Sequence, residues 1–442
     1  MPPVQQPGVT AASPDVPSTR QKTMRQVTLA GGVGTAIEYY DFSVYGFLAL
    51  TIADVFFPQS DPTAALLYTL AVFGAAFALR PIGGVLLGHV ADRYGRRPAL
   101  ATAVLGMAFA STVMGVLPSF AAIGVAAPVM LLILRCVQGI SAGGELGSAA
   151  AFVAEAAPDR TRGFHTSTAQ IGTLAGTLLG ALVVAIVRWG LTPEQLSAWG
   201  WRIPFLLSLP LGILALVVRR RVEESKDFAN LEEAGRVAKV PALAALRSHT
   251  RGVLTVCGLS LVSFAAYYIV FSYMTTYFTA QKIMSPDAAV WTSVLTLALA
   301  TIAIPLWGAA CDRWGRRPIL IGVSAANLVL GYPLFLLMGQ GSVTWAVVAQ
   351  IVLGQAEAAY MGVILAAYTE LFPAKVRSSG FSLGYNAASI ITGGSAPYIA
   401  TWLIEETSNK LAPAWMLMTA AAISLGTALT LKETARRPLP TV

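Results

Sequence analysis

Long apolar stretches alternate with short polar segments along almost the whole chain. A membrane-spanning helix needs about 20 predominantly apolar residues, and the chain holds twelve stretches of about that length or longer. The pattern therefore predicts twelve crossings, with one longer polar interruption between the sixth and the seventh. The apolar stretches cover residues 27–52, 63–90, 99–117, 122–154, 164–188, 202–220, 252–280, 288–310, 319–339, 343–369, 378–404 and 412–431.

The predicted fold class is an all-α membrane protein, with twelve transmembrane helices in two six-helix bundles. A first segment, rich in Pro, Ser and Gln, is expected to be a disordered cytoplasmic tail. The two bundles are expected on either side of the polar interruption, which would serve as a cytoplasmic linker. The predicted segments are 1–26 (tail), 27–220 (first bundle), 221–250 (linker), 251–431 (second bundle) and 432–442 (tail).

The composition agrees with a membrane protein and excludes several other classes. Hydrophobic residues make up 55% of the chain and charged residues only 12%, about half the usual charged share of a soluble domain. A soluble globule of this size has no place to bury so much apolar surface. The cysteines Cys136, Cys257 and Cys311 lie far apart, without the spacing of a disulfide framework or a metal site. We therefore expect no cofactor and no metal.

The distribution of positive charge predicts the orientation in the membrane. If the first tail is cytoplasmic, 24 of the 30 Lys and Arg residues fall in cytoplasmic segments and only 4 in outer loops. This bias is the positive-inside pattern of membrane proteins. It predicts a multi-pass protein of the cell membrane with both termini in the cytoplasm. Membrane lipid headgroups then account for the net charge of +8, and no nucleic acid partner is expected.

Two polar loops repeat within the chain. The segment GHVADRYGRRP at 88–98 recurs as GAACDRWGRRP at 308–318, and Glu155 has a looser counterpart in Glu370. The two predicted bundles therefore carry the same loops at corresponding positions. A parallel repeat joined by a cytoplasmic link is the plan of many secondary transporters, whose substrate site lies between the halves near the middle of the membrane.

The repeated loops predict a cytoplasmic gate built from ion pairs. Asp92 and Asp312 each end a membrane helix directly before a group of arginines. Breaking such a cluster would change the balance between inward-open and outward-open states. Anchoring by positive charge is the alternative, but it would not require the two aspartates. The predicted gate residues are Asp92, Arg93, Arg96, Arg97, Glu155, Arg162, Asp312, Arg313, Arg316, Arg317, Glu370 and Arg377.

Ionisable side chains inside membrane helices are costly, so each is a candidate for function. Arg80 is placed either to bind a substrate carboxylate bidentately or to pair with Glu38. Glu145 serves either helix packing or proton transfer. Glu357 suits a cationic or zwitterionic substrate, or a second proton. The remaining candidates for lining a polar substrate cavity are Tyr267, Tyr385 and Asn386, for which an interfacial position is the alternative.

The repeated loops resemble the signature of the major facilitator superfamily. Five further segments resemble the metabolite:proton symporter family within it, which includes permeases for proline and betaine, α-ketoglutarate, citrate and shikimate. The resemblance covers nearly the whole chain after residue 25 and implies proton-coupled uptake of a small molecule by alternating access. The five segments are EYYDFSVYGF (38–47), LRPIGG (79–84), RCVQGISAGGELG (135–147), WGWRIPF (199–205) and LKETARRPL (431–439).

The resemblance also implies a site for the proton. In the related sugar–proton symporters, an aspartate on the first helix and an arginine on the fourth form the proton site, and Asp41 and Arg135 match them by motif. Glu38 lies three residues before Asp41 and shares its helix face. A buried carboxylate that loses its arginine partner takes up a proton, and regaining the partner releases it. A static buried ion pair is the alternative.

The predicted function is import of a small polar metabolite, a carboxylate or a zwitterionic osmolyte, together with protons. The sequence holds no nucleophile triad, nucleotide loop or metal cluster, so an enzyme is not expected. The predicted helices contain two arginines and four carboxylates, and this excess of negative charge disfavours a highly anionic substrate. Proton-coupled export of a biosynthetic product, proton-independent diffusion and a non-transporting membrane sensor remain as alternatives.

Overall fold

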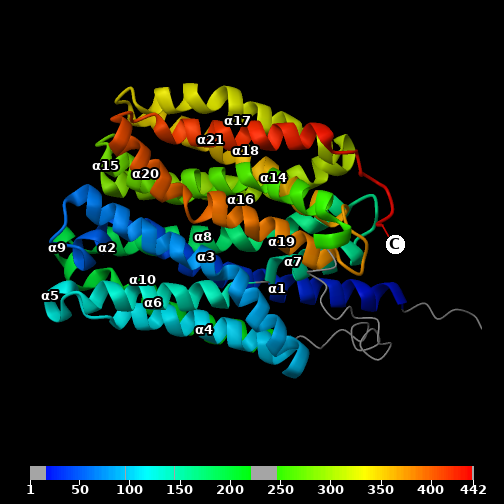
Figure 1. Cartoon of the computed structure of the whole chain (residues 1–442), viewed down its shortest axis with the longest axis horizontal. Coiled ribbons are helices and arrows are strands. Elements are labelled where there is room, and N and C mark those ends of the chain that lie inside the picture. Colours follow the sequence, from blue (N-terminus) through cyan, green and yellow to red (C-terminus); the bar gives the residue numbers. More distant parts are fainter. Residues whose placement is uncertain (1–15, 95, 144, 221–245, 441–442) are drawn as a thin grey trace, which may run out of the picture.

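The computed structural model describes residues 16–94, 96–143, 145–220 and 246–440. Every regular element within these ranges is a helix, and the long helices lie roughly side by side along the length of the molecule (Figure 1). Eight helical stretches of the described part are long and apolar enough to cross a membrane. They are Pro62–Leu87, Arg162–Gly190, Pro193–Val218, Thr250–Ala280, Pro286–Trp314, Arg316–Met338, Val343–Thr369 and Ala412–Thr430.

The first bundle contains six crossings, of which three are built from shorter pieces. The first consists of α1 and α2, the fourth of α6 and α7, and the sixth of α9, the π-helix η1, α10 and α11. The elements are α1 (Val16–Phe47), α2 (Ala49–Phe56), α3 (Pro62–Tyr94), α4 (Arg96–Val116), α5 (Phe120–Ile123), α6 (Ala126–Ser141), α7 (Glu145–Ala156), α8 (Arg162–Gly190), α9 (Pro193–Gln195), η1 (Leu196–Gly200), α10 (Arg202–Leu206) and α11 (Ser208–Arg220).

The second bundle contains the other six crossings, and two of these include a π-helical turn, a local widening common at functional sites. The elements are α14 (Thr250–Ala266), η2 (Tyr267–Tyr273), α15 (Met274–Ala280), α16 (Pro286–Trp314), α17 (Arg316–Met338), α18 (Val343–Thr369), α19 (Arg377–Ala388), η3 (Ser389–Gly393), α20 (Ala396–Thr407) and α21 (Ala412–Thr430). Each of the twelve predicted crossings therefore has a helical counterpart, which confirms the predicted fold class.

Local sequence signals set several helix boundaries. The side chain of Asp61 accepts hydrogen bonds from the backbone of Thr63 at 2.9 Å and Ala64 at 3.3 Å, so it caps the start of α3. Ser285 caps α16 in the same way, directly before a proline in the first turn. Gly315 ends α16 with a φ of +101°, a conformation that other residues rarely adopt.

The first helix extends beyond its predicted start. α1 begins at Val16, whereas the predicted tail runs to residue 26. Pro17 occupies the first turn of α1, where its missing N–H group costs nothing. The polar residues that follow contain no helix breaker before the glycines near residue 31. Residues 1–15 of the predicted tail and 221–245 of the predicted linker lie outside the described part.

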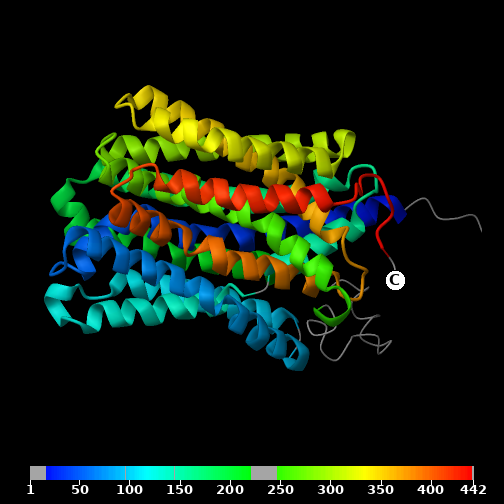
Figure 2. The ribbon, with the colours of Figure 1, turned by 45° about the horizontal axis from the view of Figure 1, so that its top comes forward.

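The two bundles pack against each other along their length, with α8 and α16 at the contact (Figures 1 and 2). At one end, which carries the loops 88–98 and 308–318 and which we call the repeat-loop end, Gly163 lies against Gly308. A Cβ atom added to Gly163 would lie 2.7 Å from the carbonyl oxygen of Gly308. At the opposite end, a Cβ atom on Gly74 would lie 3.1 Å from the carbonyl oxygen of Gly394. The bundles are therefore in contact at both ends.

Candidate functional site

A small cavity lies where α1, α3, α6 and α7 of the first bundle meet α19 of the second. Its free volume is about 30 Å³, room for no more than two or three water molecules. Three predicted substrate-binding residues, Arg80, Tyr385 and Asn386, share this cavity with Glu38. The lining residues are Thr35, Glu38, Tyr39, Arg80, Ala142, Leu146, Gly147, Ser382, Tyr385 and Asn386.

Arg80 forms an ion pair on the wall of this cavity. Its Nη2 atom donates to Oε1 of Glu38 at 3.3 Å. The guanidinium also lies over the rings of Phe42 and Phe77, 4.6 and 4.4 Å from their centroids, and such contacts stabilise a buried cation. The Nε atom of Arg80 has no hydrogen-bond partner. The pairing with Glu38 is one of the two predicted roles of Arg80, and it leaves one donor unused.

Arg135 is fully buried beside this pair. Its Nη1 atom donates to Oε1 of Gln138 at 2.8 Å, and its Nη2 atom contacts the carbonyl oxygen of Phe73 at 3.4 Å. Gln138 in turn donates to Oγ of Ser111 at 2.6 Å. The ring of Tyr45 lies 4.3 Å below the guanidinium. Neutral oxygens and aromatic faces therefore hold Arg135 in this conformation.

Asp41 is also fully buried, at 0% exposure. Its Oδ1 atom accepts a hydrogen bond from the hydroxyl of Ser208 in α11, and its Oδ2 atom has no partner. The resemblance pairs Asp41 with Arg135, but Arg135 directs both Nη atoms elsewhere. A static ion pair between the two, the alternative considered from sequence, is not present in this conformation.

Two other intramembrane candidates, Glu357 and Tyr267, do not line the cavity. Glu357 is buried within the second bundle. Tyr267, in η2, shares a hydrogen bond with Thr177 of α8 and packs against Tyr39 with ring centroids 5.7 Å apart. This bond joins the two bundles. The side chain of Glu145 lies outside the described part.

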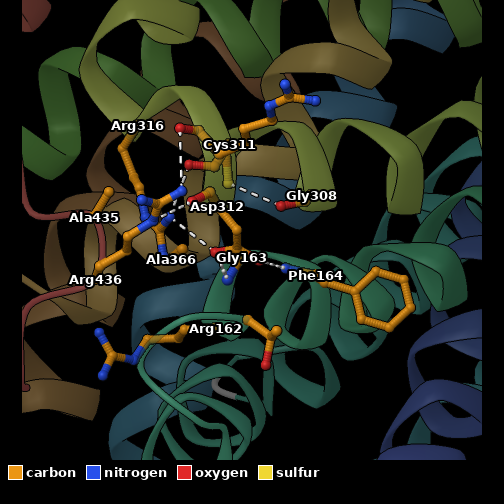
Figure 3. A network of polar contacts seen from close by, with 12 residues as sticks. Arg162, Gly163, Phe164, Gly308, Cys311, Asp312, Arg316, Ala366, Ala435 and Arg436 are labelled. Carbon is orange, nitrogen blue, oxygen red and sulfur yellow. Dashed lines mark hydrogen bonds and ion pairs between the residues drawn. The ribbon is translucent and has the colours of Figure 1, made fainter.

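At the repeat-loop end, Asp312 joins the second bundle to the start of α8 (Figure 3). Its two carboxylate oxygens accept hydrogen bonds from the backbone N–H groups of Gly163 at 2.8 Å and Phe164 at 2.9 Å. The N-terminus of a helix carries partial positive charge, so it favours a carboxylate there. Arg316 also donates to Asp312 at 2.9 Å. Asp312 thus caps a helix of the other bundle.

Two further ion pairs join the bundles at this end. Arg162 of the first bundle donates to Glu370 of the second at 2.9 Å, and Arg377 of the second donates to Glu155 of the first. Arg316 also reaches Glu370, at 3.1 Å. The arginine of each bundle therefore pairs with the repeated glutamate of the other bundle. We call this group, Glu155, Arg162, Asp312, Arg316, Glu370 and Arg377, the interbundle cluster.

Of the remaining predicted gate residues, Arg313 and Arg317 make described contacts outside the interbundle cluster. Arg317 donates to the carbonyl oxygen of Leu429 at 3.0 Å, and Arg93 is exposed. Arg313 accepts a contact from Arg436 at its backbone oxygen. The side chains of Asp92, Arg96 and Arg97 lie outside the described part.

The C-terminal segment contributes contacts that sequence reasoning missed. Glu433 accepts the backbone N–H groups of Arg316 and Arg317, both at 3.0 Å, and so caps α17. Burial alone would raise the pKa of Glu433, but these and neighbouring backbone N–H groups hold its pKa below the usual range. Thr434 donates to Glu370 at 2.5 Å. The sequence signal for these contacts was the segment LKETARRPL (431–439), in which a carboxylate lies among positively charged residues.

These features define a class of membrane protein. Two six-helix bundles enclose buried charged side chains near a cavity, and ion pairs close one end, as in transporters of the major facilitator fold. A structure of the proton:xylose symporter XylE shares this fold, with a TM-score of 0.75 at 19% sequence identity over 95% of this chain and 98% of that chain. Sequence comparison then identifies the family.

The chain belongs to the sugar and metabolite transporter family of the major facilitator superfamily, and it is not an enzyme. The model of the family described as "Sugar (and other) transporter" matches residues 27–239 and 218–442. A proline/betaine transporter of Salmonella typhimurium is 36% identical over 425 residues, 94% of this chain and 85% of the relative. A shikimate transporter of Escherichia coli is 35% identical over 428 residues, 96% of this chain and 98% of the relative.

Proposed function

We propose that this multi-pass membrane transporter imports a small carboxylate or zwitterionic osmolyte together with protons, by alternating access. The Arg80–Glu38 ion pair at the cavity between the bundles carries the proposal. A zwitterion has a charge for each partner, so it can separate the pair without leaving a net buried charge. The relatives, transporters of proline and betaine and of shikimate, support this substrate class.

The proposed binding mode follows from the geometry of Arg80. A substrate carboxylate would use the Nε donor that has no partner now, together with an Nη donor. Tyr39 and Tyr385 offer aromatic faces to a cationic group, and Glu38 offers the countercharge. The cavity of about 30 Å³ is too small for such a molecule, so binding requires the bundles to separate at one end.

Asp41 is the proposed proton carrier in the first bundle. It is buried, and one of its oxygens is free to hold a proton. Arg135 is the proposed partner in the deprotonated state, reached when it exchanges Gln138 for the carboxylate. The positive charge on the repeat loops supports a cytoplasmic position for these loops and for both termini, and the interbundle cluster is then the proposed cytoplasmic gate.

Flux into proteoliposomes tests the proposal. The purified protein would be offered radiolabelled glycine betaine, proline, shikimate and citrate, with an acidic exterior or without a pH gradient. We expect accumulation of a zwitterion or a monocarboxylate that requires the acidic exterior and collapses with a protonophore. Accumulation driven by an acidic interior would indicate an exporter. Flux that ignores the gradient would indicate facilitated diffusion, and binding without flux would indicate a sensor.

A further inference from the structure

Among the buried carboxylates in the described part of the second bundle, Glu357 forms no ion pair, whereas Asp312 and Glu370 do. Glu357, in α18, is 0% exposed. Its Oε1 atom accepts a hydrogen bond from the hydroxyl of Ser263 in α14 at 2.5 Å, and its Oε2 atom has no partner. An ionised carboxylate in an apolar interior is strongly unfavourable unless a cation or several donors compensate it. A single serine hydroxyl provides little compensation.

The surroundings of Asp41 in the first bundle are similar. Asp41 and Glu357 are both 0% exposed, and each accepts one hydrogen bond from a serine on another helix. In each carboxylate the second oxygen has no partner. Within the described residues, each bundle therefore holds a buried carboxylate with an oxygen available for a proton. Glu357 does not line the cavity at Arg80, so the geometry favours the proton over the substrate.

The ionisable groups near Glu357 on its own and adjoining helices are mostly neutral. Tyr360 and Tyr368 lie on α18 itself, where their hydroxyls bond to Leu259 and Ser260 of α14. The other tyrosine, cysteine and histidine groups on adjoining elements are Cys257 on α14, Tyr267, Tyr268 and Tyr273 on η2, Cys311 on α16, Tyr332 on α17, His165 on α8 and Tyr385 on α19.

The charged groups on the helices around α18 lie at the helix ends. Glu370 follows Glu357 by thirteen residues, about 20 Å along a helix. Glu370 bonds to Arg162 of α8 and Arg316 of α17. Asp312 of α16, Arg377 of α19 and Glu155 of α7 lie in the same interbundle cluster. Arg251 of α14 is exposed at that end, Arg188 and Asp287 pair at the opposite end, and the side chain of Glu145 is not described.

We infer that Glu357 is a second proton-binding site, which loads and releases a proton in each transport cycle. Ser263, whose hydroxyl donates to Glu357, is only partly buried. A proton from water on the acidic side would neutralise the carboxylate, and the reverse transfer on the other side would restore it. The inference rests on the proposed symport and extends it to two protons per substrate molecule.

The ratio of internal to external substrate at zero net flux tests this inference. Each coupled proton contributes about 1.4 kcal/mol, or a factor of ten, per pH unit. The membrane potential is held at zero by potassium and valinomycin, the exterior is more acidic by one pH unit, and glycine betaine or shikimate is the probe. Two coupled protons then give about 100-fold accumulation in the unmodified protein. Glu357→Gln, which mimics the protonated group, should reduce this to about tenfold. Glu194→Gln, an exposed carboxylate on an outer turn, is the control and should keep the 100-fold ratio.

The outcomes separate this inference from the proposed function. About tenfold accumulation in the unmodified protein, or an unchanged ratio in Glu357→Gln, would overturn the second site and leave symport intact. An accumulation ratio that does not respond to the pH gradient would contradict proton symport itself. Infrared titration of the carboxyl band in lipid gives a second readout that needs no transport. Loss of a protonated-carboxyl band in Glu357→Gln supports the site, and an unchanged spectrum overturns it.

A second variant covers the case in which Glu357→Gln does not fold. Ser263→Ala keeps the carboxylate and removes the hydrogen bond that the Ser263 hydroxyl donates to it. We expect slower uptake and a shifted titration of the Glu357 band, with the 100-fold ratio retained. An unchanged titration and an unchanged uptake rate would contradict the role of Ser263 and the proton site that it serves.

Discussion

Each buried charge in the first bundle is held by partners that compensate it only in part. Arg80 has Glu38 and two aromatic rings, whereas Arg135 has a glutamine, a carbonyl oxygen and aromatic rings. Asp41 has one serine hydroxyl. A group that is incompletely compensated gains from a new partner, because an unsatisfied buried polar group costs about 1–3 kcal/mol. The site is therefore suited to exchange partners when substrate and protons arrive.

Replacing Asp41 by asparagine removes the proposed proton carrier and keeps the shape of the side chain. We expect the accumulation ratio to fall about tenfold at a gradient of one pH unit, since one coupled proton is lost. Exchange of labelled for unlabelled substrate needs no net proton movement and should persist. The control is Asp54→Asn, an exposed carboxylate at the end of α2. Full accumulation by a folded Asp41→Asn protein would remove Asp41 from the proton pathway.

Replacing Arg80 by lysine keeps the positive charge but removes the planar fork that binds a carboxylate through two donors. We expect affinity for glycine betaine to fall about tenfold, which corresponds to about 1.4 kcal/mol. Affinity for choline, which lacks the carboxylate, should change little. Calorimetry with both ligands measures the effect. An equal loss for both ligands would show that Arg80 supports the fold rather than the carboxylate.

The sequence identified these residues as candidates but did not give their partners. A charged residue within an apolar stretch can be recognised from the chain alone, which is how Asp41, Arg80 and Glu357 were found. The partners Ser208 and Ser263 are small hydroxyl residues on distant segments, and nothing in their local pattern sets them apart. The pairing of Arg80 with Glu38 could be predicted only as one of two roles.

At the scale of the helix, the repeat-loop end combines capping with ion pairing. Asp312 lies in the last turn of α16 and caps α8, a helix of the other bundle, so one carboxylate joins two helices. Glu433, in the C-terminal segment, caps the start of α17. A charged residue near a helix terminus contributes up to about 2 kcal/mol when it is partly buried. Opening this end requires the contacts of Asp312 with α8 to break together with the ion pairs between the bundles.

Replacing Asp312 by asparagine weakens the cap on α8 without changing its shape. A loss of about 1–2 kcal/mol would make the open state of this end roughly tenfold more populated. Cys311, which is fully buried beside the contact, should then react faster with a small maleimide, as mass spectrometry of its peptide can follow. The control is Asp159→Asn, whose partner Arg162 lies in the same bundle. Equal labelling of Cys311 in all three proteins would show that the cluster only anchors the loops.

The helices were easier to predict than the links between them. Apolar runs of about 20 residues gave all twelve crossings, because membrane-spanning length imposes a strong pattern. The same pattern did not show that α6 and α7, or η2 and α14, are separate pieces, since a short change in hydrogen bonding leaves the hydrophobicity unchanged. The C-terminal segment was predicted as a tail, but Glu433 and Thr434 attach it to the interbundle cluster.

At the scale of the whole molecule, the two bundles are in contact at both ends. Gly163 and Gly308 lie together at the repeat-loop end, and Gly74 and Gly394 at the opposite end. Arg188 of α8 also pairs with Asp287 of α16 at that opposite end, at 3.0 Å. With so little free volume between them, the bundles enclose the site from both sides. Alternating access then predicts that either end can open while the other stays closed.

Two glycine substitutions should open the two ends selectively. A leucine at Gly74 would collide with the backbone of Gly394 and hold the opposite end apart, so Cys311 should remain protected from maleimide. A leucine at Gly308 would meet Ser167, whose Oγ atom lies 2.3 Å from a Cβ added there, so labelling of Cys311 should rise.

Both variants should retain ligand binding but lose most transport, because a wedged molecule does not complete the cycle. The matched control is Gly322→Leu, where an added Cβ meets nothing within 4 Å; it should resemble the unmodified protein in labelling and flux. The two wedges must also differ from each other, since alternating access makes the ends mutually exclusive. If Gly74→Leu and Gly308→Leu both exposed Cys311, the bundles would separate as a whole, and a rocking motion about an enclosed site would be the wrong description of this transporter.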